Sequence, residues 1–81
     1  MDNDAYQPIS CDLHSQYELA IMHKNKLYLS WLAEGKLISA TNITPLDVQT
    51  KNKAEYLMAK TAESKNICIR LDHITKMRIL Y

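Results

Sequence analysis

The chain has 81 residues, enough for one small domain with a modest hydrophobic core. One glycine and two prolines exclude a glycine-rich phosphate loop, and no apolar run approaches the ~20 residues that cross a membrane. The first 22 residues hold four acidic and no basic side chains, a net charge of −4, while the remainder holds ten basic and five acidic ones, a net charge of +5. The total of +1 therefore hides a dipolar molecule, which suggests contact with a protein and argues against simple wrapping of nucleic acid.

A polar, flexible arm is expected over residues 1–8, followed by a helix over residues 12–24. Ser10 or Asp12 can cap this helix, because either side chain can accept hydrogen bonds from free backbone N–H groups. The apolar residues at helical spacing are Leu13, Tyr17, Ala20 and Ile21. The residues on the other face are His14, Ser15, Glu18 and Met22. We therefore expect an amphipathic helix whose outer face carries acidic charge.

After residue 25 the apolar pattern changes to period two, which is typical of strands. Strands are expected at residues 27–32, 37–44, 55–61, 67–72 and 74–80. Glu34-Gly35 forms the first hairpin turn, Pro45 ends the second strand because proline donates no ladder hydrogen bond, and residues 46–53 form a polar loop. The element order predicts a mainly β single domain over residues 1–81: a strongly bent five-stranded antiparallel sheet, or partly open barrel, with an N-terminal α-helix over one open end.

The sequence shows no constellation of catalytic or metal-binding residues. The three histidines lack the spacing of metal ligands, and nothing local activates either cysteine as a nucleophile. The alternation places Ile69 and Leu71 on the buried face of the fourth strand, and Trp31 in the core or an interface rather than on a stacking surface. We therefore predict a protein that is not an enzyme and that uses neither a metal nor a cofactor.

Cys11 and Cys68 are the only cysteines, and they could pair as a disulfide in principle. The opening residues 1–4, however, have neither the basic start nor the apolar stretch of a secretory signal. We therefore expect two reduced thiols and a cytoplasmic protein. Cys68 falls in an expected strand, where it would serve as a small packing residue.

Four segments carry a resemblance to a known family. They are Tyr6–Asp12 (Tyr-Gln-Pro-Ile-Ser-Cys-Asp), Glu18–Ala20, Lys51-Asn52 with Glu55–Leu57, and Arg70–Thr75 (Arg-Leu-Asp-His-Ile-Thr). In order and spacing they resemble the Rho-binding antiterminators (Rof), small inhibitors of the bacterial transcription termination factor Rho. The resemblance extends over nearly the whole chain. One departure is that Leu13 and Ser15 stand where the family pattern favours acidic residues.

The resemblance implies an Sm-like fold and a function in transcription antitermination. A protein of this family is expected to bind the RNA-binding N-terminal region of the Rho hexamer and to obstruct RNA loading, so that termination fails. An acidic helix face can compete for such a site by presenting carboxylates to Arg and Lys side chains. The residues that the resemblance places at the Rho contact are Asp12, His14, Ser15, Glu18, Lys51 and Asn52. It further implies a monomer as the active form, with no cofactor, no direct nucleic-acid binding and no role at a membrane.

Two other functions stay open. An Sm-like RNA-binding module would suit the net charge of +5 after residue 22, although the basic residues are scattered along the chain. A structural homo-oligomer would suit an Sm-like fold that pairs through its edge strands, for which residues 74–81 or 55–61 are the candidates. The acidic first segment favours the Rho inhibitor over the RNA-binding module, because it would repel phosphate.

Overall fold

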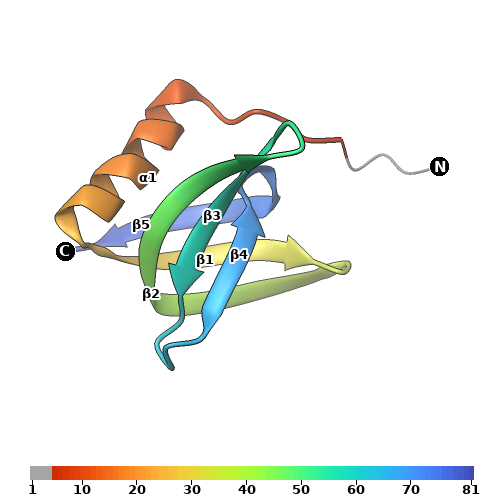
Figure 1. The fold of residues 1–81 in the computed structure, drawn as a ribbon. Helices are drawn as coiled ribbons and strands as arrows, with labels where there is room; N and C mark the ends of the chain where they lie inside the picture. The colour runs from red at the N-terminus through yellow and green to blue at the C-terminus, as the bar shows by residue number, and fades with distance from the viewer. Residues whose placement is uncertain (1–4) are drawn as a thin grey trace.

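The computed structural model describes residues 5–81. In chain order the elements are α1 (Cys11–His23), β1 (Lys26–Ala33), β2 (Lys36–Lys51), β3 (Ala54–Lys60), β4 (Asn66–Arg70), the 3₁₀ turn η1 (Leu71–His73) and β5 (Ile74–Leu80). The five strands pair antiparallel in the order β4-β3-β2-β1-β5 and curve strongly, with α1 across one end (Figure 1). This confirms the predicted mainly β architecture, and the open sheet is compatible with the Sm-like fold that the resemblance implies. Within residues 5–81, no helix is both long and apolar enough to span a membrane.

Helix α1 begins where Ser10 caps it. The Ser10 Oγ accepts a hydrogen bond from the Leu13 N–H at 3.2 Å, and Asp12 adds negative charge in the first turn, where the helix dipole favours it. At the other end Lys24 adopts the left-handed conformation (φ 58°), and its N–H closes the helix onto the carbonyls of Ala20 and Ile21. Of the two predicted caps Ser10 is therefore the correct one. The helix starts and ends one residue earlier than predicted.

The hydrophobic core lies between α1 and the curved sheet. Tyr17 and Ala20 are fully buried, and Leu13 and Ile21 pack partly buried beside them, as the helical spacing predicts. The buried residues from the strands and η1 are Leu27, Leu29, Ile43, Leu57, Ala59, Ile69 and Leu71. Trp31 packs against this cluster, as predicted. Each fully buried Leu or Ile side chain contributes about 1.5–3 kcal/mol, so one polar substitution here removes a large part of the stability of a small domain.

Strand β2 differs from the prediction, because it continues through Pro45. Its first half pairs with β1 and its second half pairs with β3, so one long curved strand serves both halves of the sheet (Figure 1). The register shifts between Pro45 and Asp47. A bulge at this point tolerates a residue without an N–H group and bends the strand. The polar loop predicted over residues 46–53 is therefore wrong, and residues 52–53 alone form the turn into β3.

The sheet has two outer strands, β4 and β5. The predicted edge at residues 74–81 is confirmed by β5, while the alternative at residues 55–61 is wrong because β3 lies between β2 and β4. Strand β4 is shorter than predicted, since it ends at Arg70 and the chain turns through η1 into β5. Leu71 is nevertheless buried, as predicted, with 1% of its surface exposed.

The end of the N-terminal arm is held against the sheet. The Gln7 N–H donates to Asp72 Oδ2 at 2.9 Å, and the Tyr6 hydroxyl donates to Glu55 Oε1 at 3.3 Å. Figure 1 shows this segment running beside the β2–β3 turn before it enters α1. The flexible arm over residues 1–8 stays a prediction, and its first four residues lie outside the described part of the chain.

Candidate protein-binding site

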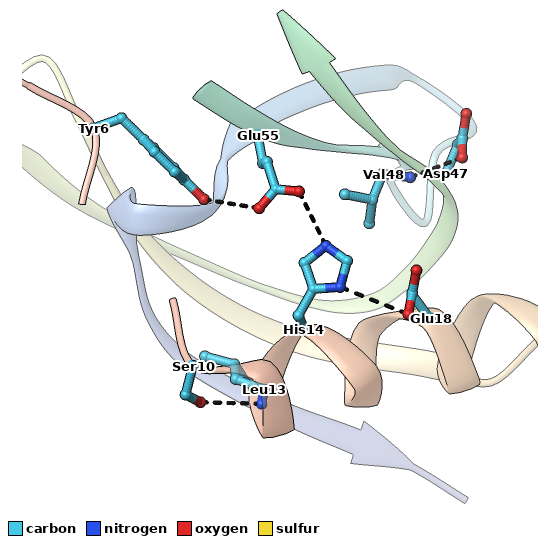
Figure 2. Close-up of polar contacts among 8 residues, drawn as sticks. All are labelled: Tyr6, Ser10, Leu13, His14, Glu18, Asp47, Val48 and Glu55. Carbon is cyan, nitrogen blue, oxygen red and sulfur yellow. Dashed lines mark hydrogen bonds and ion pairs between the residues drawn. The ribbon is translucent and has the colours of Figure 1, made fainter. Parts of the chain in front are cut away.

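Three carboxylates from three elements lie around His14 and Val48 in Figure 2: Glu18 of α1, Asp47 of β2 and Glu55 of β3. We call the surface formed by these three residues the acidic side. His14 connects two of them, because its Nε2 lies 3.1 Å from Glu55 Oε2 and its Nδ1 lies 3.6 Å from Glu18 Oε1. Glu18 follows His14 by one helical turn, so the helix itself sets the second contact. The imidazole therefore lies between α1 and β3, in contact with both carboxylates.

A groove of about 260 Å³ lies between α1 and β2, next to this histidine bridge. The residues that line it are Glu18, Ile21, Met22, Asp47 and Val48. Asp47 Oδ1 accepts the Val48 N–H at 2.9 Å, which orients the carboxylate, and 60% of the Glu18 side chain is exposed. An apolar surface with one carboxylate on each wall suits a Lys or Arg side chain, because the stem packs on the apolar part and the cationic end meets the carboxylates.

Glu55 also anchors the N-terminal segment through Tyr6. The Tyr6 hydroxyl donates to Glu55, and the Arg70 guanidinium lies 5.8 Å from the centroid of the Tyr6 ring, within the range of a cation–π contact. Burial raises the pKa of Tyr6, and the neighbouring Glu55 charge raises it further. Tyr6 therefore remains a neutral hydrogen-bond donor over the physiological pH range, and Glu55 remains its acceptor.

Asp72 holds the next residue of the same segment. Its carboxylate accepts hydrogen bonds from Arg70 Nε at 2.6 Å, from Arg70 Nη2 at 2.8 Å and from the Gln7 N–H at 2.9 Å. Burial opposes ionisation of Asp72, but the hydrogen bonds from Arg70 and Gln7 outweigh it and lower the pKa of the carboxyl group. The hydrogen bond from Gln7 therefore ties the N-terminal segment to η1, and Arg70 orients the Asp72 carboxylate that accepts it.

The helical members of the predicted site share the outer surface of α1. Asp12, Ser15 and Glu18 are exposed. His14 is more enclosed, with 27% of its side chain exposed, because it bridges to β3. The structure thus brings His14 and Glu18 into contact, while Asp12 and Ser15 lie exposed on the first turns of the same helix. The role of these residues in binding stays a prediction.

The other predicted site residues, Lys51 and Asn52, lie where β2 turns into β3. Lys51 ends β2, and Asn52 adopts a left-handed conformation (φ 50°) in the turn. The preceding pair in the ladder is Thr50 with Glu55. Because Glu55 contacts both His14 and Tyr6, this turn lies close to the start of α1.

Two carboxylates of the acidic side, Asp47 and Glu55, are absent from the predicted site. Asp47 is not predicted from the sequence, because a second strand that ends at Pro45 would leave it in a loop. Glu55 has a signal in the sequence, since it belongs to one of the segments that carry the resemblance. Those segments contact one another in the fold: Tyr6 meets Glu55, and Gln7 meets Asp72. Part of the family pattern therefore maintains the position of the N-terminal segment.

The acidic side has the character of a recognition surface. Among residues 5–81, no three His, Cys, Asp or Glu side chains converge as ligands of a metal ion. Cys11 and Cys68 are free thiols, so the disulfide considered from sequence is not formed. Cys68 is exposed rather than packed, because its side of the outer strand β4 faces solvent. What the acidic side offers chemically is two oriented carboxylates and an apolar groove, which together can recognise a cation.

A family model and two similar proteins point to the same family. A family model described as modulator of Rho-dependent transcription termination (ROF) matches residues 8–81. Protein rof of Escherichia coli (strain K12) is 38% identical over 74 residues, which is 90% of this chain and 81% of that protein. Protein rof of Shigella flexneri matches with the same identity and coverage.

Among solved structures, the proteasome accessory factor B/C (PafBC) of Arthrobacter aurescens superposes with a TM-score of 0.74. Its sequence is 15% identical, and the match covers 93% of this chain and 12% of that one. This likeness shows a shared fold and nothing further. The match of the family model over residues 8–81, with the 38% identity to two relatives, shows that the chain belongs to the Rof family of modulators of Rho-dependent transcription termination.

Proposed function

We propose that this protein inhibits Rho-dependent termination by binding the RNA-binding N-terminal region of the Rho hexamer and obstructing RNA loading. Membership of the family identifies the process in which the protein acts, which is the modulation of Rho-dependent termination. A surface that binds RNA must hold phosphates with Arg and Lys side chains. A protein that presents carboxylates in the right places can occupy the same side chains. The activity therefore consists of binding and involves no chemical step.

The groove between Glu18 and Asp47 is the observation that carries this proposal. A Lys or Arg side chain of Rho enters it, with its stem on Met22 and Val48 and its charged end between the two carboxylates. A hydrogen bond to a charged group contributes about 1.5–3 kcal/mol. The Val48 N–H orients Asp47 before Rho arrives, which lowers the entropy cost of binding, and His14 lies beside Glu18.

The rest of the predicted contact lies on the first turns of α1 and at the β2–β3 turn. Asp12 adds a second carboxylate on α1, and Ser15 adds a hydroxyl group. Lys51 and Asn52 contribute polar groups from the β2–β3 turn. The proposed Rho-binding surface is therefore the outer face of α1 with the adjoining turn, and Asp47 is the residue that the structure adds to it.

The test measures binding of the purified protein to Rho with and without a pyrimidine-rich RNA. We expect direct binding that the RNA displaces. We expect the double variant D12K/E18K to bind Rho at least about tenfold more weakly, because two attractive charges become repulsive. The matched control E34K/E63K makes the same change of net charge at the β1–β2 turn and after β3, away from the acidic side, and we expect it to bind as the wild type does.

Three results would contradict the proposal. Equal weakening in both double variants would attribute the effect to net charge rather than to the acidic side. Binding that RNA does not displace would place the contact outside the RNA site of Rho. Normal termination by Rho with this protein in excess would exclude inhibition. Far-ultraviolet circular dichroism of each variant confirms that the comparison is made between folded proteins.

A further inference from the structure

The outer surface of β1 and β5 carries a second charged region, of the opposite sign. Tyr28 alternates along β1 with Leu27 and Leu29, which are fully buried, so its side chain points away from the core. On the paired strand β5, Arg78 lies directly opposite Tyr28, and Lys76 lies two residues away on the same face. We call this region the basic face, and it consists of Lys26, Tyr28, Thr41, Lys76 and Arg78.

A hollow of about 310 Å³ lies on the basic face. The residues that line it are Tyr28, Thr41, Lys76, Arg78 and Leu80, a set without Asp or Glu. Within residues 5–81, neither Lys76 nor Arg78 forms an ion pair. Lys26 donates to the Thr44 hydroxyl at 2.6 Å, which is a neutral partner. The hollow therefore holds positive charge that no acidic side chain of the described residues neutralises.

Tyr28 lies along β1 beside these charges. Its hydroxyl accepts a hydrogen bond from Ser30 Oγ at 3.3 Å, and Ser30 lies two residues further along the same strand. Tyr28 is half-buried and lines the hollow, so part of its side chain remains accessible to a ligand there. Hydrogen bonding with Ser30 and Ser39 lowers the pKa of Tyr28, and the charges of Lys76 and Arg78 contribute in the same direction against an opposing effect of burial.

The spacing of these groups fits a strand of nucleic acid. Residues two positions apart on a β-strand are about 6.6 Å apart, so Lys76 and Arg78 present two cations at a separation close to that of successive phosphates in an extended single strand. Proteins that bind single strands without sequence preference combine such a line of cations with exposed aromatic rings on which bases stack. The basic face has both components, with Tyr28 placed directly beside Arg78.

We propose that the basic face binds single-stranded nucleic acid, with a base stacked on Tyr28 and phosphates held by Lys26, Lys76 and Arg78. In the sequence these basic residues are scattered, which argued against such a site. The pairing of β1 with β5 gathers them around one aromatic ring. This inference does not rest on the proposed contact with Rho, because it concerns other residues and its test contains no Rho.

The test uses a fluorescently labelled oligouridine of about 12 nucleotides and measures its anisotropy with increasing protein at low salt. We expect binding whose affinity falls with salt with a logarithmic slope of about −2, as three phosphate contacts to a single strand predict. The double variant K76E/R78E is expected to bind at least about tenfold more weakly. Tyr28→Ala is expected to lose about fivefold or more, which is the contribution of one stacked base.

The matched control is K60E/K65E, which changes net charge equally at the β3–β4 connection, where both lysines are exposed. We expect it to bind the oligouridine like the wild type. Absence of binding at low salt, or equal loss in K76E/R78E and K60E/K65E, would overturn the proposal. Full affinity in Tyr28→Ala together with equal competition by polyglutamate would also overturn it, because the face would then recognise acidic polymers in general.

The same variants separate this inference from the proposed function. We expect K76E/R78E to retain Rho binding and D12K/E18K to retain oligouridine binding. A loss of oligouridine binding in D12K/E18K, with that variant folded, would contradict the assignment to the basic face.

Discussion

The acidic side and the basic face differ in how their charges are held. On the acidic side, Glu18 and Glu55 contact His14, and Asp47 accepts a backbone N–H. On the basic face, the cationic ends of Lys76 and Arg78 form no ion pair within residues 5–81. Carboxylates that already have neighbouring partners suit a folded partner, whereas cations without an ion pair suit a polymer of phosphates. We therefore expect the two surfaces of this small domain to bind different kinds of partner.

The core is what the two surfaces share, and Ile69→Asp is the change expected to break both. Ile69 is 4% exposed, and a carboxylate in its place is buried without a partner. We expect a loss of at least about 4 kcal/mol in the free energy of unfolding, enough to unfold the domain. Chemical denaturation followed by circular dichroism measures this. The control is Cys68→Asp, because Cys68 is the exposed neighbour of Ile69 on β4 and should tolerate the charge. An unchanged melting temperature for Ile69→Asp would show that the assigned strand register is wrong.

Asp72→Asn is expected to loosen the N-terminal segment, which contacts Glu55 of the acidic side through Tyr6, and to leave the basic face unchanged. It removes the charge that holds Arg70 and the Gln7 N–H, at a cost of about 2–3 kcal/mol in the free energy of unfolding. Because folding lowers the pKa of Asp72 below its usual 3.8, its contribution is complete above about pH 3.8 and is lost as the pH falls through the folded value. In acid titrations, the free energy of unfolding should therefore depend less on pH in Asp72→Asn than in the wild type. Weaker Rho binding with unchanged oligouridine binding is the expected functional result, and the reverse pattern would disprove the anchoring role.

Tyr17→Phe is the smallest change and should leave both surfaces intact. The Tyr17 hydroxyl is buried without a hydrogen-bond partner among the described residues, so its removal is expected to stabilise the fold by about 1 kcal/mol. Burial also raises the pKa of Tyr17 from 10.0 to about 12, so wild-type stability should decline between these pH values by about 2–3 kcal/mol from this residue. Denaturation at pH 9 and pH 12, compared between wild type and variant, tests both statements. A parallel decline in the two proteins would assign it to other groups.

The fold follows from the sequence wherever a local pattern decides the structure. The helical spacing of Leu13 and Tyr17 locates α1, and Glu34-Gly35 takes the positive φ angles of a tight hairpin turn. Pro45 shows where local rules fail. A proline ends an ordinary strand, but this one sits at a bulge in a strand that two different neighbours hold. That information resides in the tertiary pairing and not in the residues around position 45.

The two surfaces are harder to predict from the sequence than the core. The exposed residues of α1 follow from helical periodicity, whereas Asp47 joins Glu18 only because β2 passes behind the helix after its bend. The basic face is similar, since Tyr28 and Arg78 are 50 positions apart and meet through the pairing of β1 with β5. Both surfaces combine residues that are distant in the chain, so a pattern within one segment reveals only part of each.

The two exposed thiols give this protein its own attachment points for optical probes. A dye on Cys11 lies next to Asp12 at the start of α1, and a dye on Cys68 lies on β4, the strand at the opposite edge of the sheet from β5. With Cys68→Ser, a single environment-sensitive label reports on the helix; with Cys11→Ser, it reports on the far edge. Energy transfer from either position to a labelled partner then gives the orientation in which the domain docks, without introducing a new residue for labelling.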